Sequence, residues 1–440
     1  MFDKYATLKN TMEQIISIIL LVFLYFSLAM LVLYLPRICY YFFAFKKQDK
    51  LNNSKKNRIA VIIPARNEST VIGHCLDTLA KQTYDSNYFD IHIVVADKKD
   101  PTIEIAYLYE RTHITIINEQ TCKGDALDGV LKKILADDPD KYDAFLIVDA
   151  DNLAAKDLLE EMNNALASGK QIICGKKLIK NWQSRRRDSR SLVSNCTALV
   201  WTMVDELGNR ARNAFGMTIT MVGTGMMVRA DVIKQNDGWP YRGLTEDYEM
   251  AMDAVLKDWS SMYYSHAKVY TEEAIDEKTA SKRKLRWISG HVEAKRKYGK
   301  KIRKKILSKE TTFKNIGFLI GTYPVAIFFG VSMVIIMGGL ALLGFWAGGF
   351  GSYDVNLMFL ILRLVWIPLV LVYGALFLYT LIILIADWKN MKVPLYEKFA
   401  VLFFHPLYAV SYFPVYIIAN LKKSDSVKWA ATDRIEFEAD

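Results

Sequence analysis

Hydrophobic positions are concentrated near the two ends of this chain, and its middle is polar. Residues 14–36 form an apolar run that exceeds the about 20 residues needed to cross a bilayer. Further apolar stretches cover residues 316–345, 356–386 and 398–420. The pattern predicts four parts: an N-terminal transmembrane anchor over 1–46, a globular domain over 47–300, interfacial and transmembrane helices over 301–421, and a tail over 422–440.

Basic residues beside the apolar runs indicate which side of the membrane each part occupies. A cleavable signal peptide is the alternative for 14–36, but the run is too long for the apolar core of such a peptide, and no small-residue cleavage site follows it. Lysine and arginine crowd residues 46–58 and 295–305, which places the middle domain in the cytoplasm. Four single spans would put the C-terminus outside, whereas the basic tail favours inside, so the number of spans stays open. The basic tail residues are Lys422, Lys423, Lys428 and Arg434.

Within the middle domain, short β-rich runs alternate with helical patterns. Four apolar runs read as buried strands, at 59–63, 91–95, 114–117 and 145–148. Residues 69–82 and 125–136 have helical periodicity. This alternation predicts an α/β fold with a parallel, doubly wound sheet. Ligands of such sheets bind at the carboxyl ends of the strands, so a functional site is expected there.

Composition and charge exclude several classes of protein. The formal net charge of +10 would suit nucleic acid, but the basic residues flank the apolar stretches, so a lipid bilayer is the expected partner and nucleic acid is not. The five cysteines are widely spaced and form no C-x-x-C pair, which predicts reduced thiols rather than a disulfide framework. A hydrophobic content of 52% excludes a disordered chain.

Polar and charged residues follow each of the four predicted strands. Any one of these turns has a simpler explanation, because Asp and Asn are common in helix caps and turns. Four such turns at the same edge of a sheet favour a shared polar site. The turns occupy residues 64–68, 97–100, 123–125 and 149–152.

Two carboxylates one residue apart, Asp149 and Asp151, follow the fourth predicted strand. Hard oxygen donors at this spacing suit Mg²⁺ or Mn²⁺, which hold substrate phosphates through few protein ligands. The sequence has no G-x-x-x-x-G-K-[ST] loop, so Lys123 beside Gly124 is a candidate phosphate contact instead. Asp97 is a candidate for hydrogen bonding to a base or ribose.

Two later motifs supply a candidate base and a set of cations. Asp247 lies in a T-E-D-Y motif after a glycine-rich segment and can serve as a general base. Arg283 and Arg286 are three residues apart on one helical face, beside Trp287. Arginine forks match phosphate oxygens, and an indole stacks on sugar rings. A helix lying on lipid headgroups is the alternative for the basic run 282–305, chiefly for its C-terminal half.

In chain order, the motifs P-A-R-N-E, D-x-x-D, D-A-D, G-T-G-M, T-E-D and R-x-x-R-W resemble those of membrane-embedded family 2 glycosyltransferases. Cellulose, chitin, hyaluronan and poly-N-acetylglucosamine synthases belong to that group. The resemblance covers residues 57–300 and implies a GT-A (Rossmann-like) fold that binds a UDP-sugar with Mg²⁺ or Mn²⁺. Relatives often have Gln where this chain has Arg283. Lys428-Trp429 with Thr432 and Arg434 also looks like the cytosolic tail motif of some relatives.

The resemblance implies a role for each matched residue. Asp247 with its neighbour Glu246 would be catalytic, and Asp149 and Asp151 would bind the diphosphate and the metal, Asp151 directly. The acceptor would contact Trp287, Gly225 and Met226. The residues expected to bind the UDP-sugar are Ala65, Asn67, Glu68, Asp97, Lys123, Asp149, Asp151, Arg283, Arg286 and Trp287.

These roles imply an inverting, processive transferase that builds a β-linked polysaccharide from UDP-glucose, in preference to UDP-N-acetylglucosamine, and exports the growing chain through the membrane. Arg363 and His405 lie in apolar stretches and are candidates for lining a polymer channel, with snorkelling and ordinary packing as the alternatives. A non-processive transferase that glycosylates a membrane lipid is the alternative enzyme. A transporter or receptor with a cytosolic binding domain would instead bind UDP without turnover.

Overall fold

The computed structural model describes residues 47–184, 187–308 and 373–421, together with isolated positions elsewhere. The predicted apolar stretches 14–36 and 316–345 and the first half of 356–386 lie mostly outside the described residues, as do Arg363 and the basic tail. Four of the five cysteines are described, and all four are free thiols.

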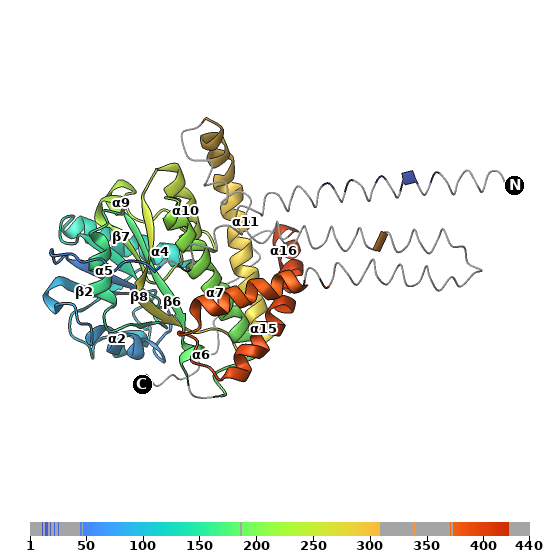
Figure 1. The fold of residues 1–440 in the computed structure, drawn as a ribbon. Coiled ribbons are helices and arrows are strands. Elements are labelled where there is room, and N and C mark those ends of the chain that lie inside the picture. The colour runs from blue at the N-terminus through green and yellow to red at the C-terminus, as the bar shows by residue number, and fades with distance from the viewer. Residues whose placement is uncertain are drawn as a thin grey trace, which may run out of the picture.

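An eight-stranded sheet forms the centre of the molecule (Figure 1). Its spatial order is β3-β2-β1-β4-β7-β6-β8-β5. The strands are β1 Ile59–Pro64, β2 Phe89–Val95, β3 Thr112–Ile116, β4 Ala144–Ile147, β5 Leu153–Ala154, β6 Ile172–Ile179, β7 Met226–Arg229 and β8 Ser261–Thr271.

The sheet is mixed, which corrects the prediction of a parallel, doubly wound sheet. Strands β1 to β4, all predicted, are parallel to one another. Strand β7 is antiparallel to both β4 and β6, and β5 is antiparallel to β8. Hydrophobic runs reveal that a strand exists and is buried, but its direction depends on how the chain returns to the sheet. Here β7 returns after a long helical excursion through residues 192–214.

Helices cover both faces of the sheet and extend beyond one of its edges (Figure 1). One hydrophobic core joins the sheet to α4, α9 and α10, and a second joins the other face to α2, α3 and α5. The helices are α2 Ile72–Ala80, α3 Thr102–Ala106, α4 Lys123–Asp137, α5 Leu158–Leu166, α6 Lys180–Gln183, α7 Leu192–Thr202, α8 Arg210–Ala214, α9 Ala230–Gln235, α10 Glu246–Leu256, α11 Glu277–Leu307, α15 Leu395–Val410 and α16 Tyr412–Leu421, with a 3₁₀ turn at Ser86–Tyr88 and a π-helix at Met203–Asn209.

The long helix α11 runs through residue 300, where the sequence suggested a domain boundary, without interruption. Its buried residues Ile288 and Val292 pack with Tyr412 and Ala419 of α16. The helix Tyr373–Asp387 and α15 share another core with α6 and α7. The described C-terminal segment therefore packs directly on the α/β domain.

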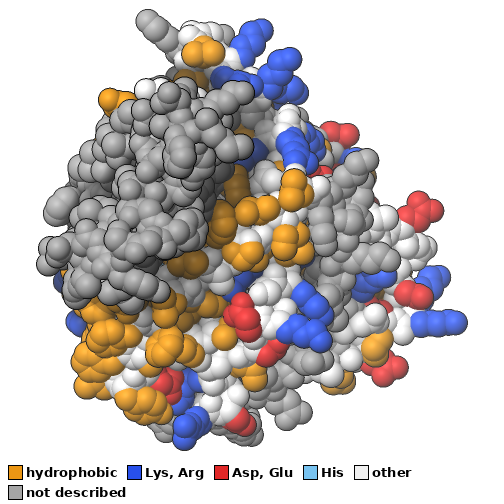
Figure 2. Space-filling model, turned by 90° about the vertical axis from the view of Figure 1, so that its right-hand side faces the viewer, with side chains coloured by type: hydrophobic (Ala, Val, Ile, Leu, Met, Phe, Trp, Pro, Cys, Tyr) orange, Lys and Arg blue, Asp and Glu red, His pale blue; other side chains and the backbone are white. Residues whose placement is uncertain are grey.

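Within the described part of the chain, one helical run, Leu395–Leu421, is long and apolar enough to cross a membrane. It has 27 residues and a mean hydropathy of 1.6, and 28% of its most apolar window is buried. A core helix meets the same criteria of length and composition. The run is divided at Ser411 into α15 and α16. Figure 2 views the face that carries α11, α15 and α16 and shows hydrophobic side chains gathered on it. On α15, Phe399, Phe403, Phe404 and Leu407 are exposed.

His405, a candidate for lining a channel, lies inside this packing. It is 5% exposed, and its Nδ1 atom is 2.9 Å from the Thr380 hydroxyl. These contacts are those of a packing histidine with a satisfied polar atom, which was the alternative explanation of this residue.

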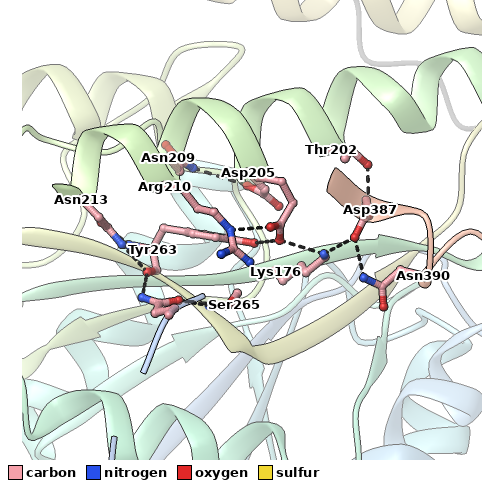
Figure 3. Close-up of polar contacts among 12 residues, drawn as sticks. Lys176, Thr202, Asp205, Asn209, Arg210, Asn213, Tyr263, Ser265, Asp387 and Asn390 are labelled. Carbon is pink, nitrogen blue, oxygen red and sulfur yellow. Dashed lines mark hydrogen bonds and ion pairs between the residues drawn. The ribbon is translucent and has the colours of Figure 1, made fainter. Parts of the chain in front are cut away.

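A charged network under α7 ties the C-terminal segment to the sheet (Figure 3). Lys176 on β6 lies 2.5 Å from Asp387 Oδ1 and 2.8 Å from Glu206 Oε1. Glu206 also pairs with Arg210 and accepts the Tyr263 hydroxyl at 2.8 Å. We call Lys176, Glu206, Arg210 and Asp387 the β6 cluster. Glu206 belongs to the π-helix, a local irregularity that proteins use mainly at functional sites.

Candidate active site

The turn after β1 is held by the loop after β2. Asn67 has a positive φ of 56°, and its N–H donates to Asp100 Oδ2 at 2.9 Å. The other oxygen of Asp100 accepts the N–H of Thr102 at the start of α3, and the Thr102 hydroxyl accepts the N–H of Glu68. Buried Ala65 continues the ladder by donating its N–H to the Val94 carbonyl at 2.8 Å. The predicted polar turns at 64–68 and 97–100 thus form one connected rim.

At the end of β4, Asp149 meets the lysine that begins α4. Lys123 Nζ lies 2.6 Å from Asp149 Oδ1 and donates to the Gly223 carbonyl at 2.6 Å. The Asp149 N–H donates to the Thr224 hydroxyl at 3.2 Å. The sequence neighbour of Lys123 must be glycine, because a Cβ at Gly124 would lie 1.9 Å from the Tyr241 carbonyl oxygen. The close packing of the Gly124 and Tyr241 backbones therefore positions Lys123 at the end of β4.

The first turn of α10 brings two more carboxylates to the same place. Glu246 Oε1 lies 3.3 Å from Lys123 Nζ. A Cβ added at Gly223 would lie 3.2 Å from that ammonium and 3.3 Å from Asp247 Oδ2, so Asp247 faces the same small space. The other Asp247 oxygen accepts the N–H of Tyr248 at 2.7 Å. We call Lys123, Asp149, Glu246 and Asp247 the strand-end cluster.

Negative charge exceeds positive charge in the strand-end cluster, and the pKa values reflect this. Burial, then repulsion from Glu246, raises the pKa of Asp247 to about 7, although Lys123 and Arg286 oppose the shift. Burial and the nearby Asp151 and Glu246 raise the pKa of Asp149 against the attraction of Lys123. Burial opposes the charge of Lys123, but its carboxylate neighbours raise its pKa overall. A carboxyl group with a pKa near neutrality is suited to general base catalysis.

Asp151 lies in the same loop as Asp149, but its hydrogen bonds are made with other residues. Its Oδ1 accepts the side-chain N–H of Asn152 at 3.0 Å, and its backbone carbonyl accepts a hydrogen bond from the buried Lys180. Asn152 is 1% exposed, and its Oδ1 is buried without a hydrogen-bond partner in the described part of the chain. Unsatisfied oxygen beside a carboxylate is compatible with a bound cation.

The described residues include no group of three or more histidine, cysteine, aspartate or glutamate side chains that could hold a metal ion by themselves. Asp149 and Asp151 are therefore a two-carboxylate set. Mg²⁺ commonly uses one or two carboxylates and completes its shell with substrate phosphates and water. The donor set fits a divalent ion that binds together with a diphosphate.

The R-x-x-R-W motif lies on α11, which packs against the α10 loop. A Cβ at Gly290 would lie 2.5 Å from the Thr245 hydroxyl, and Lys297 pairs with Glu249 at 2.7 Å. Arg286 donates to the Leu244 carbonyl at 3.4 Å and is close enough to Asp247 to lower its pKa. The structure thus brings the cationic helix and the predicted base together.

A model of the family described as "Glycosyltransferase like family 2" matches residues 57–290. This chain belongs to that family. The match covers more than half of the chain and includes every predicted site residue.

Two curated relatives match parts of this glycosyltransferase. The probable glycosyltransferase YdaM of Bacillus subtilis (strain 168) is 21% identical over 248 residues, which are 54% of this chain and 56% of YdaM. The probable glucomannan 4-beta-mannosyltransferase 3 of Oryza sativa subsp. japonica is 32% identical over 91 residues, 21% of this chain and 16% of the rice protein. This glycosyltransferase therefore spans less than two thirds of either relative's length.

Among solved structures, the mannosyltransferase PcManGT from Pyrobaculum calidifontis, in complex with GDP-Man and Mn²⁺, superposes with a TM-score of 0.53 at 16% identity, covering 89% of this chain and 98% of that one. The likeness is one of fold. The expected fold is confirmed in its coarse form, as a GT-A-like α/β fold with a mixed sheet.

Asp97, Gly225 and Met226 are the remaining residues predicted for the site of this glycosyltransferase. Asp97 is exposed, and its carboxylate accepts the N–H of Lys99 within its own turn at 2.9 Å. Met226 is 1% exposed in the core, and Gly225 has a φ of 60° and room for no Cβ beside Val269. Their roles in uridine and acceptor binding stay predictions.

The structure adds residues that the sequence analysis did not assign. Lys180 contacts the Asp151 loop, as described above. Glu273 contacts Lys177, Trp201 and Arg283. The ring of Trp201 in turn contacts that of Trp287. In the sequence, the T-E-E turn that contains Glu273 is an acidic turn before a basic helix, but its partners come from β6 and from α7, where Trp201 is 72 residues away.

Proposed function

We propose that this glycosyltransferase transfers a sugar from a UDP-sugar to the growing end of a β-linked polysaccharide with inversion at the anomeric carbon. The observation that carries the proposal is the strand-end cluster. In it, a carboxyl group whose pKa is raised to about 7 lies beside a lysine-bound aspartate, and an arginine of α11 is near. UDP-glucose, in preference to UDP-N-acetylglucosamine, is the proposed donor.

Asp247 acts as the general base. Its carboxylate takes the proton of the acceptor hydroxyl as the hydroxyl oxygen forms a bond to the anomeric carbon. The bond from that carbon to the diphosphate oxygen breaks, and UDP leaves with the electron pair. Attack from the side opposite the diphosphate converts an α-linked donor into a β-linkage. Glu246 and Lys123 set the charge around Asp247, because Glu246 raises its pKa and Lys123 lowers it.

Charge on the departing diphosphate has several partners in the proposed complex. Asp149 and Asp151 would hold Mg²⁺ or Mn²⁺, which would offset the negative charge of the diphosphate. Arg283 and Arg286 would contact the phosphate oxygens from α11, and Trp287 would contact the acceptor. Ala65, Asn67, Glu68 and Asp97 would line the nucleoside at the rim after β1 and β2.

The proposed location is the cell membrane, with the catalytic domain in the cytoplasm and polymer exported through the adjacent helices. The exposed apolar side chains of α15 support contact with lipid. The same surface supports a second candidate function, non-processive transfer of a sugar to a membrane lipid, because a lipid acceptor held there would also be near α11.

The decisive experiment offers radiolabelled UDP-glucose, UDP-N-acetylglucosamine and GDP-mannose to the purified full chain with Mg²⁺ or Mn²⁺. The proposal expects label in a high-molecular-weight product from a UDP-sugar. Label in an organic-extractable glycolipid supports the second candidate, and a product from GDP-mannose alone contradicts the donor assignment. UDP binding with no product from any donor indicates a receptor or transporter.

Asp247→Asn is the matching variant. It keeps the shape of the side chain but accepts no proton, so transfer is expected to fall by roughly 10³-fold while UDP binding persists. Asp231→Asn, at an exposed pair with Arg229, is the control and is expected to retain wild-type turnover. Wild-type turnover by Asp247→Asn removes this residue from the mechanism.

A further inference from the structure

A second group of aromatic and charged side chains lies next to α11. It consists of Lys177 on β6, Trp201 on α7, Glu273 after β8, and Arg283 and Trp287 on α11, and we call it the Trp201 cluster. The indole rings of Trp201 and Trp287 meet edge to face, with centroids 5.0 Å apart at 80°. Both indoles are partly exposed.

Glu273 is the centre of the Trp201 cluster. Its side chain accepts the indole N–H of Trp201 at 2.6 Å and lies 3.5 Å from Lys177 Nζ and 3.4 Å from Arg283. Its backbone is fixed as well, because the side chain of Asn181 bonds to both its N–H and its carbonyl. Glu273 is 2% exposed. A buried carboxylate with three side-chain donors holds those donors in one geometry.

Trp201 is held from two further directions. The Lys177 ammonium lies 3.5 Å from the centroid of its ring, which is a cation–π contact. Trp201 is also followed at once by Thr202 and the π-helix, whose Asp205 accepts the N–H of Lys177 at 3.0 Å. The β6 cluster fastens this same helix to the sheet (Figure 3). The indole is therefore locked before any ligand arrives.

The Trp201 cluster adjoins the strand-end cluster. Arg283 and Trp287 belong to the same helical turn as Arg286, which is close enough to Asp247 to lower its pKa. Lys177 is close enough to Asp149 for the two charges to interact. An acceptor that reaches Asp247 along α11 would pass the two partly exposed indoles.

A cation lies beside an indole face in the Trp201 cluster. Lys177 and Arg283 both lie beside Glu273. Burial lowers the pKa of Lys177, with Glu273 opposing and Arg283 adding to the effect. Indole faces with adjacent polar donors are suited to a sugar ring, which has apolar C–H faces and an equatorial rim of hydroxyls.

We propose that Trp201 forms, with Trp287, an aromatic wall that binds the acceptor sugar, and that Glu273 is the positioning residue that holds this wall. This inference rests on the proposed function and names a part of its acceptor site. Glu273 touches no reacting atom and acts through Trp201, Lys177 and Arg283.

The test uses the purified full chain, labelled UDP-glucose as donor and the β-1,4-linked glucose tetrasaccharide as the acceptor probe. Trp201→Leu removes the aromatic face, and Trp201→Phe restores one without the indole N–H. Glu273→Gln keeps an oxygen for that N–H but removes the charge that holds Lys177 and Arg283. Trp259→Leu is the control, because Trp259 also donates its indole N–H to a side-chain oxygen and carries a lysine over its ring.

The acceptor KM is expected to rise about tenfold in Trp201→Leu and less in Trp201→Phe, which corresponds to the typical strength of an aromatic contact. Glu273→Gln is expected to raise the acceptor KM as well. In both Trp201 variants the Kd for UDP with Mn²⁺ should match that of the wild type. Trp259→Leu should leave both constants unchanged.

Two results overturn the inference. An acceptor KM in Trp201→Leu no higher than in Trp259→Leu, with a glycosyl product still formed, contradicts the aromatic wall while the proposed function stands. A lower melting temperature and a lower kcat with no change in acceptor KM assigns Trp201 and Glu273 to folding alone. If the wild type forms no glycosyl product, the proposed function fails and this inference fails with it.

Discussion

The strand-end cluster and the β6 cluster use the same residue types for different purposes. The strand-end cluster has one cation, Lys123, and the three carboxylates of Asp149, Glu246 and Asp247, and Asp149 keeps 39% of its side-chain surface exposed. The β6 cluster pairs two cations with two carboxylates, and its Lys176 is only 6% exposed. Excess negative charge at an open site is suited to binding a cation or releasing a proton. Balanced charge in a closed site is suited to holding two segments together.

The energetics differ in the same way. Removing one partner of a buried ion pair leaves a charge without compensation and is strongly destabilising. A partly solvated charge can be relieved by water or by a change of its pKa. Loss of a cation from the β6 cluster should therefore appear as lost stability, and loss of the cation from the strand-end cluster should appear as lost activity.

The largest expected effect comes from replacing the lysine of each cluster with methionine. Lys176→Met leaves Glu206 and Asp387 short of one cation and should lower the free energy of unfolding by about 3–5 kcal/mol. Lys123→Met should lower stability much less but should cut turnover by roughly 10²-fold. The substitution removes the ammonium group that holds Asp149 and that, in the wild type, lowers the pKa of Asp247. Thermal unfolding and initial rates of the purified chain measure both effects.

Lys234→Met is the control for this comparison. Lys234 pairs with Asp140 at the surface, and exposed pairs of this kind contribute less than about 1 kcal/mol. If Lys123→Met and Lys176→Met lose equal stability and equal activity, the distinction between the two clusters is wrong.

An intermediate effect is expected in the pH dependence of turnover. Asp247 must be ionised to accept a proton, and its pKa is raised to about 7 by burial and by Glu246. The ratio kcat/KM should fall about tenfold for each pH unit below 7 and level off above it. In Lys123→Met the acidic limb should move to higher pH, because Lys123 holds the pKa of Asp247 down. A flat profile between about pH 5 and pH 8 contradicts the role of Asp247 as the base.

The smallest effect concerns Asp205, beside the β6 cluster. Burial raises the pKa of Asp205 to about 7 from an ordinary value of 3.8, so the folded protein holds a proton that the unfolded chain releases. Its contribution to stability is present below about pH 4 and is lost as the pH rises to 7. Asp205→Asn cannot titrate and keeps an oxygen for the N–H of Lys177.

Melting temperatures of wild type and Asp205→Asn at about pH 5.5 and pH 8 give the measurement. The melting temperature of Asp205→Asn minus that of the wild type should be larger at pH 8 than at pH 5.5, by about 4 °C. Asp247 titrates in both proteins, so the comparison isolates Asp205. A difference that does not change with pH indicates that Asp205 is ionised throughout.

The sequence alone identified the parallel half of the sheet closely. The predicted strand at 59–63 is β1 Ile59–Pro64, and the one at 145–148 is β4 Ala144–Ile147. Continuous apolar runs are a local signal of burial on both faces, so no tertiary information was needed. The strands β6 and β8 were missed because polar and charged residues interrupt them, including Lys176 and Lys177.

Candidate site residues were recoverable where they follow a predicted strand or lie in a recognisable motif. Asp149, Lys123 and Asp247 were identified in this way, and the structure brings them together. Trp201 was not identified, because a tryptophan in an apolar helix looks the same whether it packs in a core or faces a ligand. Glu273 lies in an acidic turn, and the sequence shows no partner for it.

The sequence by itself determined which residues are buried in the parallel strands and which acidic turns follow them, because those signals are carried by neighbours along the chain. Only the tertiary structure decided that Lys176 and Lys177, which are adjacent on β6, have different partners on opposite faces of the strand. One is held by Asp387 in the β6 cluster, and the other lies over Trp201. Side chains alternate across a strand, and the groups that meet each face come from segments far away in sequence. Pairings of that kind are fixed by the packing of α7, α11 and the C-terminal helices on the sheet.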